Sequence, residues 1–204
     1  ALNAGGRSSA ASSFFLPLDR VERALTLLQN GDEIDRGGLL GTFQQVPFPD
    51  AKRLGLSSEE EVAFRKQFPE TDGVLVIKQI VPDGPLSEWA RVGDVLLSIN
   101  GQRIIGFVEL DALLDDNVGS SVSIEVQRAG TTIQKDLVVA DLHQVSPDDL
   151  ILGCNGSFND VSYQLARHYN IPIKGVTVAF AGYCFSNAGI ERGNVIRSIN
   201  DIPI

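Results

Sequence analysis

One nine-residue segment occurs twice in this sequence, almost unchanged. Residues 93–101 read Gly-Asp-Val-Leu-Leu-Ser-Ile-Asn-Gly, and residues 193–201 read Gly-Asn-Val-Ile-Arg-Ser-Ile-Asn-Asp. In each copy a glycine turn precedes a short apolar strand that ends in a second turn at asparagine, a pattern typical of a β-hairpin. Strongly β-branched strands open at Gly73 and Gly175, which are 102 residues apart. The matching offsets predict a tandem duplication of one β-rich unit.

Length and charge limit the classes of partner. The chain has 204 residues, a net charge of −9 and a pI near 4.7. This length favours two domains. The acidic balance disfavours nucleic acid and anionic membranes as partners, and no apolar run reaches the roughly 18 to 20 residues of a membrane span. Peptides and unfolded protein segments are therefore the expected partners.

The residue types that carry chemistry are sparse. The sequence contains no phosphate-binding loop, dinucleotide fingerprint or zinc-ligand spacing, so we expect neither a cofactor nor a metal. Cys154 and Cys184 are too few for a disulfide scaffold and lack the CxxC spacing, so we expect two buried thiols. His143 and His168 are the only histidines, and neither adjoins a plausible nucleophile. We therefore expect both to have structural or surface roles, and we expect no catalytic residue in this chain.

Periodicity and turn residues predict the order of the elements. The first part of the chain has a pair of short strands and then a helix, before a glycine-rich segment leads into the first β-rich unit. The expected elements are strands at 1–4 and 14–18, a helix from Asp19 to about Asn30, a strand at 39–45, a helix at 51–56 with a charged extension to about 68, strands at 73–80 and 95–99, a helix at 107–115, strands at 122–128 and 132–139, and, in the second unit, a helix at 161–169 and a strand at 175–180.

The ordered set of motifs resembles a known family. A Gly-Val-x-Val strand, the Gly-Asp-Val-Leu-x-x-Ile-Asn-Gly hairpin, a helix and two further strands resemble the PDZ domain in the circularly permuted order of HtrA/Deg serine proteases. Five longer phrases resemble the double-length fungal nuclear, pro-apoptotic branch of that family, and the resemblance covers essentially the whole chain. They lie at residues 14–20, 53–56, 115–119, 141–143 and 162–169.

The resemblance implies a mainly β fold with short helices, of the α+β class. It implies tandem PDZ-like, partly open β-barrels, preceded by the terminal strands of a trypsin-like β-barrel protease domain. The implied domains are the end of the protease domain at 1–18, a linker helix at 19–35, a first PDZ domain at 36–142 and an incomplete second PDZ-like domain at 143–204. The second copy stops before its long helix and its last two strands.

PDZ domains capture extended peptides, which add as a strand to a sheet edge while backbone amides of a glycine-rich loop bind the terminal carboxylate. Here the resemblance assigns the loop to Gly37, Gly38, Leu39, Leu40 and Gly41, and the adjacent strand contributes Phe43. The other wall is the helix that carries Phe107, Leu110 and Leu114, although a core face is the ordinary explanation for such a stripe. A domain that only packs against its protease is the alternative to peptide binding.

The loop departs from the family pattern at one position. HtrA loops commonly read Arg-Gly-x-apolar-Gly-apolar, which places Leu40 where the second glycine is expected when Arg36-Gly37 is taken as the anchor. Either the register slips by one residue, or the loop binds carboxylates poorly and prefers internal peptide segments. Both readings stay open at this point.

The resemblance also implies the function of the longer protein. That protein would be a serine endopeptidase with a quality-control or pro-apoptotic role, in which this region binds substrate or regulatory peptides. Leu2, Asn3 and Ala4 would form the wall of the S1 pocket, and the catalytic triad would lie upstream, so the chain alone should be inactive. Further expectations are contact with the upstream protease domain, homo-oligomerisation and nuclear localisation, with the cytoplasm as an alternative. The competing function is a non-enzymatic tandem-PDZ scaffold that binds partner C-termini.

Overall fold

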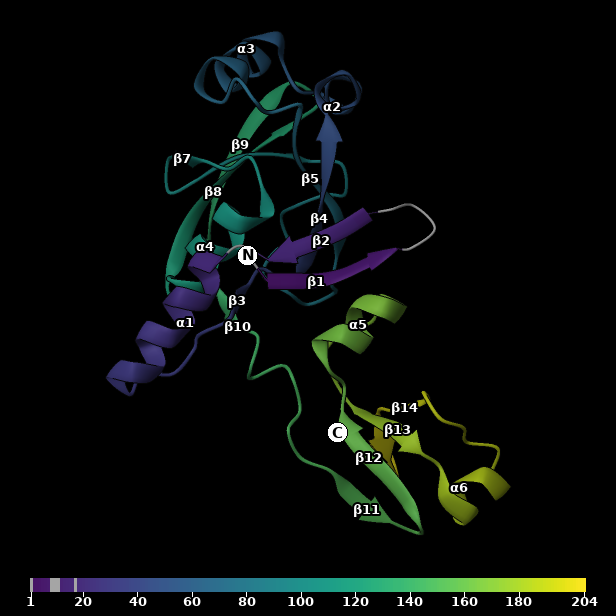
Figure 1. Cartoon of the computed structure of the whole chain (residues 1–204). Coiled ribbons are helices and arrows are strands. Elements are labelled where there is room, and N and C mark those ends of the chain that lie inside the picture. Colours follow the sequence, from purple (N-terminus) through teal and green to yellow (C-terminus); the bar gives the residue numbers. More distant parts are fainter. Residues whose placement is uncertain (1, 8–11, 17) are drawn as a thin grey trace. The chain divides into compact units, whose positions relative to one another are not determined.

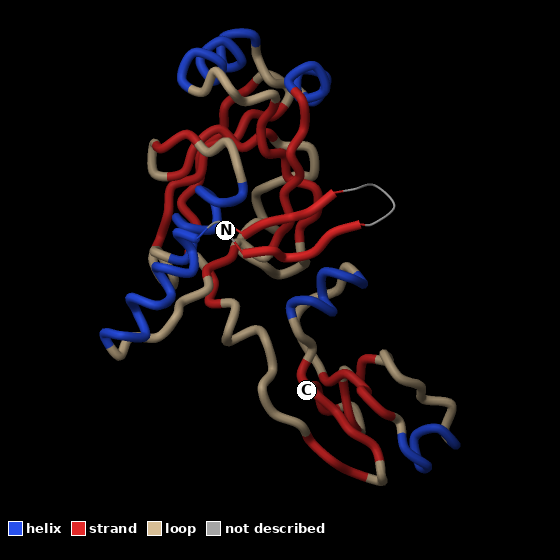
Figure 2. The backbone as a smooth tube through the Cα atoms, viewed as in Figure 1, coloured by secondary structure: helices blue, strands red, loops and turns tan. Residues whose placement is uncertain are grey.

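The computed structural model of the chain describes residues 2–7, 12–16 and 18–204. The chain divides into two compact units, Ala1–Asp35 and Arg36–Ile204. Strands joined by short helices make up most of the described chain (Figure 2), which confirms the mainly β fold with short helices. Over the described ranges, no helix has the length and apolar character needed to cross a membrane.

The first unit holds a hairpin and a helix. Strands β1 (Leu2–Arg7) and β2 (Ser12–Leu16) pair antiparallel. Helix α1 (Leu18–Asn30) follows. The helix ends where Gly31 adopts a φ of 81°, a left-handed conformation that glycine takes without a steric penalty. The predicted stop at Asn30-Gly31 is therefore confirmed.

The second unit begins with the larger sheet (Figure 1). Its strands follow the order β4-β5-β6-β8-β9, all antiparallel, with β7 paired to β6. The sheet stays open, and the described strands form no closed barrel. The strands are β4 (Gly41–Pro47), β5 (Gly73–Ile80), β6 (Val95–Ile99), β7 (Gln102–Arg103), β8 (Ser121–Arg128) and β9 (Thr131–Val138), and a separate short pair joins β3 (Gly37–Gly38) to β10 (Ala140–Asp141).

Two hydrophobic clusters flank this sheet. One packs helix α4 (Phe107–Asp115) against the sheet through residues such as Leu96, Ile99 and Leu110. The other packs helices α2 (Phe48–Leu54) and α3 (Ser58–Gln67) through Phe48 and Phe64, neither of which is exposed. All five positions of β6 are buried, and the strand contributes Leu96 and Ile99 to the first cluster and Val95 and Leu97 to the second, so it is the centre of the core.

Helices α2 and α3 correct one expectation. The sequence predicted one helix with a charged extension, but the chain breaks at Gly55, whose φ of 110° excludes helix. A Cβ at this glycine would lie 2.5 Å from the backbone of Ala129, so only glycine fits here. Ser57 then caps the new helix by accepting the N–H of Glu60. The break was missed because the reason for it lies on a turn 74 residues away.

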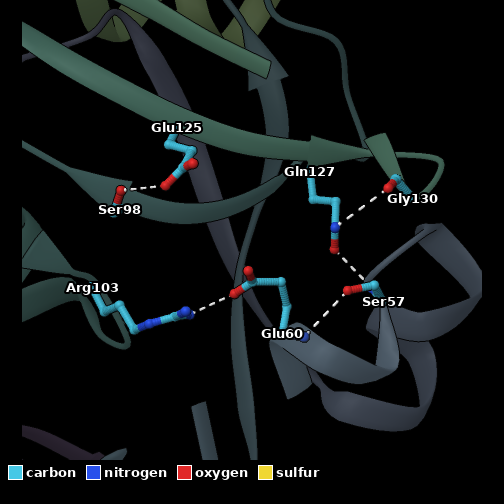
Figure 3. A network of polar contacts seen from close by, with 7 residues as sticks. All are labelled: Ser57, Glu60, Ser98, Arg103, Glu125, Gln127 and Gly130. Atoms are coloured by element: carbon cyan, nitrogen blue, oxygen red, sulfur yellow. Dashed lines mark hydrogen bonds and ion pairs between the residues drawn. The ribbon is translucent and has the colours of Figure 1, made fainter. Parts of the chain in front are cut away.

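A polar network fixes α3 to the sheet (Figure 3). The buried Gln127 accepts the N–H of Ser57 at 2.7 Å, and Arg103 pairs with Glu60 at 2.7 Å. Because Gln127 comes from β8 and Arg103 from β7, the cap of the helix is held from two strands. Buried polar groups that are satisfied in this way stabilise one arrangement of the elements.

The rest of the unit forms a smaller sheet and a short hairpin. The sheet has the order β11-β12-β13-β14, antiparallel throughout, and β15 pairs with β16. The elements are β11 (Ile151–Gly153), β12 (Gly156–Asp160), α5 (Tyr163–Tyr169), β13 (Val176–Phe180), α6 (Gly182–Asn187), β14 (Val195–Ile196), β15 (Ser198–Ile199) and β16 (Ile202–Pro203).

The two cysteines correct a second expectation. Cys154 lies in the turn between β11 and β12, and Cys184 lies in α6. Both thiols are free and both residues are exposed, so the prediction of buried thiols is wrong. The sequence pattern did not reveal that both segments lie at the surface.

Candidate functional site

The edge of β4 is the candidate peptide-binding site. β4 stands at the end of the larger sheet, and among the described strands it pairs with β5 alone. The N–H of Val81 donates to the carbonyl of Leu40 at 2.9 Å, so these two residues form a hydrogen-bonded pair. Pairs alternate along an antiparallel ladder, so the next pair, Gly41 with Ile80, is not hydrogen-bonded. The N–H and C=O of Gly41 therefore point away from β5, toward the free edge.

The same alternation continues along β4. β5 carries one extra residue, Lys78, between the partners of Thr42 and Phe43. The N–H and C=O of Ile77 bond to the turn that precedes β6. The backbone N–H and C=O of its partner Phe43 are therefore also not bonded to β5. Gln45 lies two positions further along β4, so its backbone groups also point away from β5. The free edge thus presents the backbone groups of Gly41, Phe43 and Gln45, the spacing that an added strand requires.

The two glycines at the start of the predicted loop have packing roles. A Cβ on Gly37 would lie 2.0 Å from the carbonyl oxygen of Leu114, at the end of α4. The N–H of Gly37 donates to the buried carboxylate of Asp115 at 2.8 Å. A Cβ on Gly38 would lie 2.6 Å from the side chain of Leu142. Gly37 therefore lets β3 pass close to the end of α4, Gly38 leaves room for Leu142, and the Gly37 amide is already engaged.

Leu40 adopts a backbone conformation that leucine rarely takes. Its φ is 51°, in the left-handed region, which costs roughly 1–2 kcal/mol for a residue with a Cβ. The residue is only 8% exposed, and burial of a leucine side chain stabilises by about 1.5–3 kcal/mol. The backbone thus keeps the conformation that glycine would adopt at this position, which favours the unshifted register of the loop.

The predicted apolar residues divide into core and surface positions. Leu39, Leu110 and Leu114 belong to the main core, with 2%, 3% and 4% of each residue exposed, so they cannot offer a ligand much surface. Phe43 is partly buried and packs against the same core, whereas Phe107 is 45% exposed. Phe43 and Phe107 are therefore the predicted positions with surface left to contact a ligand.

The remaining predicted residues lie elsewhere. Leu2, Asn3 and Ala4 belong to β1, in the first unit. The backbone N–H of His143 donates to the Asp141 carboxylate at 2.8 Å. The ring of His168 lies 4.6 Å from that of Tyr169.

Asp94 lies in the turn that precedes β6. Its buried carboxylate accepts the N–H of Arg91 and pairs with Arg128 at 2.7 Å. The hydrogen bond with Asp94 raises the pKa of the Arg128 guanidinium, which stays charged.

Sequence reasoning missed two residues of a distant helix, one of which contacts the loop and the other the neighbouring strand β5. The Tyr163 hydroxyl donates to the Gly41 carbonyl at 3.1 Å, and Gln79 donates its side-chain amide to the carbonyl of Arg167. Tyr163 and Arg167 belong to α5, more than a hundred residues after the loop. No local signal marks such contacts, because they depend on how two distant segments dock.

Comparison with protein-family models finds two PDZ matches. A PDZ domain model matches residues 76–128, and a PDZ-like domain model matches residues 144–204. The first match includes β6 and α4, and the second includes the smaller sheet and α5.

Curated relatives match along the whole chain. The pro-apoptotic serine protease NMA111 of Yarrowia lipolytica is 43% identical over 205 residues, which cover 99% of this chain and 21% of that protein. The protein of the same name from Eremothecium gossypii is 40% identical, over 100% of this chain and 21% of its own length. The chain thus spans about a fifth of the length of these relatives.

A solved structure of the HtrA-type protease AlgW with a decapeptide is 21% identical, with a TM-score of 0.48, over 68% of this chain and 41% of that one. The fungal relatives are about twice as similar in sequence, and they align with nearly the whole of both units. Together with the two PDZ matches, they confirm the resemblance inferred from the repeated hairpin. The chain therefore belongs to the family of HtrA-type serine proteases, within its fungal pro-apoptotic branch.

Proposed function

We propose that this chain is the peptide-binding region of a serine endopeptidase and that it captures an extended peptide on the free edge of β4. One observation carries the proposal: Gly41, Phe43 and Gln45 present their backbone groups away from β5. A peptide strand added there forms alternating hydrogen bonds with these groups. Phe43 and the exposed Phe107 are available to contact its apolar side chains.

The first test measures binding of fluorescein-labelled peptides with an apolar C-terminus, by fluorescence anisotropy. Each peptide is tested as a free acid and as a C-terminal amide. We expect the free acid to bind more tightly, because the loop around Leu40 and Gly41 then holds a carboxylate. Equal binding of both forms would show that the edge takes internal segments, and binding of neither form would reject the proposal.

A variant of β4 locates the binding site. Gln45→Pro removes an N–H that faces the free edge and leaves the bonds to β5 intact. We expect it to weaken peptide binding about fivefold or more, the value of one lost hydrogen bond. Gln45→Ala, which keeps the N–H at the same exposed position, is the matched control. Equal peptide affinity of the two variants would place the peptide elsewhere.

In the longer protein, we propose that this region delivers or gates substrates for a serine protease domain. The names of the relatives support this proposal, because both are serine proteases. This chain covers about a fifth of the length of each. We expect the isolated chain not to cleave casein, and cleavage sensitive to a serine-protease inhibitor would contradict this. Nuclear localisation, homo-oligomerisation and origin by tandem duplication are further proposals, which rest on the family resemblance and on the repeated hairpin.

A further inference from the structure

Helix α5 contacts the end of β4 where the proposed peptide would place its C-terminus. The Tyr163 hydroxyl donates to the Gly41 carbonyl at 3.1 Å. This is the carbonyl that points away from β5, because Gly41 and Ile80 are a non-hydrogen-bonded pair. A peptide strand on β4 needs the same oxygen as the acceptor for one of its own N–H groups. The phenol and the peptide therefore require one atom.

Apolar contacts surround this hydrogen bond. Leu40 and Val81, next to the start and the end of the paired strands β4 and β5, share a buried cluster with Val161 and Ala166, which precede and belong to α5. Val81 and Ala166 are fully buried, and Val161 is 2% exposed. The ring of Tyr163 packs against the same cluster. Leu40 thus directs its side chain into the contact with α5, which accounts for a leucine in a left-handed conformation.

Polar contacts flank the cluster. Gln79 of β5 donates its side-chain amide to the carbonyl of Arg167. Lys174 pairs with Asp83 at 2.6 Å, and both side chains are exposed, so this pair orients the segments more than it stabilises them. Burial raises the pKa of the Tyr163 phenol, which therefore keeps its donor proton at neutral and mildly alkaline pH.

We propose that α5 is an intramolecular cover of the β4 edge, which must leave the Gly41 carbonyl before a peptide C-terminus can bind. The inference rests on the proposed peptide-binding function and adds its regulation. Because only open molecules can bind the peptide, the observed affinity is the affinity of the open state multiplied by the fraction of molecules that are open. Conversely, a bound peptide releases α5 and with it the segment from Val161 to Tyr169.

The test compares two variants of one helix. Tyr163→Phe removes the hydroxyl that donates to Gly41 and keeps the ring in its cluster, so the fold is retained. Tyr169→Phe makes the same chemical change at an exposed position of α5 and is the matched control. With a free-acid peptide in the anisotropy assay, we expect Tyr163→Phe to bind about three- to tenfold more tightly than the unchanged chain, the effect of one hydrogen bond, and Tyr169→Phe to bind equally.

A second measurement follows α5 itself. Amide hydrogen exchange of residues 161–169 is recorded without peptide and at saturating peptide, and we expect faster exchange in the saturated sample. Unchanged exchange on saturation, or a Tyr163→Phe affinity no tighter than that of the unchanged chain, would overturn the cover. If peptide binding is measurable and either of these results is found, the cover is rejected and the peptide-binding function is not. Absence of binding by the unchanged chain and by Tyr163→Phe rejects the peptide-binding function, and the cover with it.

Discussion

The two copies of the repeated hairpin have the same turn and different surroundings. In the first, the N–H of Gly93 donates to Ile77, the N–H of Ile77 donates to Asp94, and the Asp94 side chain accepts the N–H of Arg91. The second repeats this set of bonds with Gly193, Val178, Asn194 and Glu191 in the same places. Asn100 and Asn200 both adopt a φ of 51°. The turn therefore makes the same bonds to the preceding long strand in both copies.

Burial differs sharply between the copies. Ile99 is fully buried beneath β8 and α4, whereas Ile199 at the matching position is 60% exposed. Asp94 is buried and paired with Arg128 of β8, whereas Asn194 is exposed and its side chain accepts a hydrogen bond within the turn. The same turn thus precedes a core strand in one copy and a surface strand in the other.

The largest expected difference concerns the matched isoleucines. Ile99→Ala should lower the free energy of unfolding by about 2–5 kcal/mol, the cost of a cavity in a packed core. Ile199→Ala should change it by less than about 0.5 kcal/mol. Urea unfolding measures the first effect through the fluorescence of Trp89, which is the only tryptophan and packs against the main core. Hydrogen exchange of β13 measures the second, and similar losses at both sites would contradict the comparison.

The acidic turn residue should have the next largest effect. Asp94→Asn gives the first hairpin the residue that the second has at the matching position, and it removes the charge that pairs with Arg128. We expect a loss of about 1–3 kcal/mol in urea unfolding, because a hydrogen bond to a charged, buried group is lost. The reverse change, Asn194→Asp, should leave the exchange rates of β13 almost unchanged. If Asp94→Asn were neutral, the ion pair would not distinguish the two copies.

The turn glycines should behave alike. Gly93 and Gly193 have φ values of 96° and 89°, and a Cβ added at either position would lie 3.7 Å or more from the nearest atom beyond the adjoining residues. Gly93→Ala and Gly193→Ala therefore meet backbone strain without a steric clash, and each should cost about 1 kcal/mol or slightly more. Trp89 fluorescence and β13 exchange report the two losses. Clearly unequal values would show that the turns are less alike than their hydrogen bonds.

The smallest effect concerns a pair of thiols that the first copy lacks. A hydrogen bond with Cys154 raises the pKa of the Cys184 thiol, so less thiolate is present at a given pH. Cys154→Ala removes that partner and should accelerate alkylation of Cys184 by iodoacetamide at pH 8 about two- to threefold. Mass spectrometry of the labelled chain measures the rate. A slower reaction in the variant would contradict the assigned direction of the pKa change.

The sequence predicted the features whose causes are local. The turn glycines, the stop at Asn30-Gly31 and the helix from Phe107 to Asp115 each depend on residues within one turn of the feature. The hairpin and the motifs around it also identified the family, because their order along the chain is specific.

Features with distant causes escaped prediction. The helix break at Gly55 follows from its approach to Ala129, and the role of Leu40 follows from its burial with Val161. The accessible surface of Phe107, in contrast to Leu110 on the same helix, depends on how α4 packs. In each case the deciding neighbour lies tens of residues or more away in the sequence.

The free edge of β4 also bears on how copies of this protein behave in concentrated solution. An unpaired strand is a template for further strands, and long flat edges lead to aggregation. β4 is seven residues long, ends in a proline that lacks an N–H, and lies beside an irregularity opposite Lys78 that increases local twist. These features oppose the stacking of many strands on this edge, so we expect no self-association into fibres through β4.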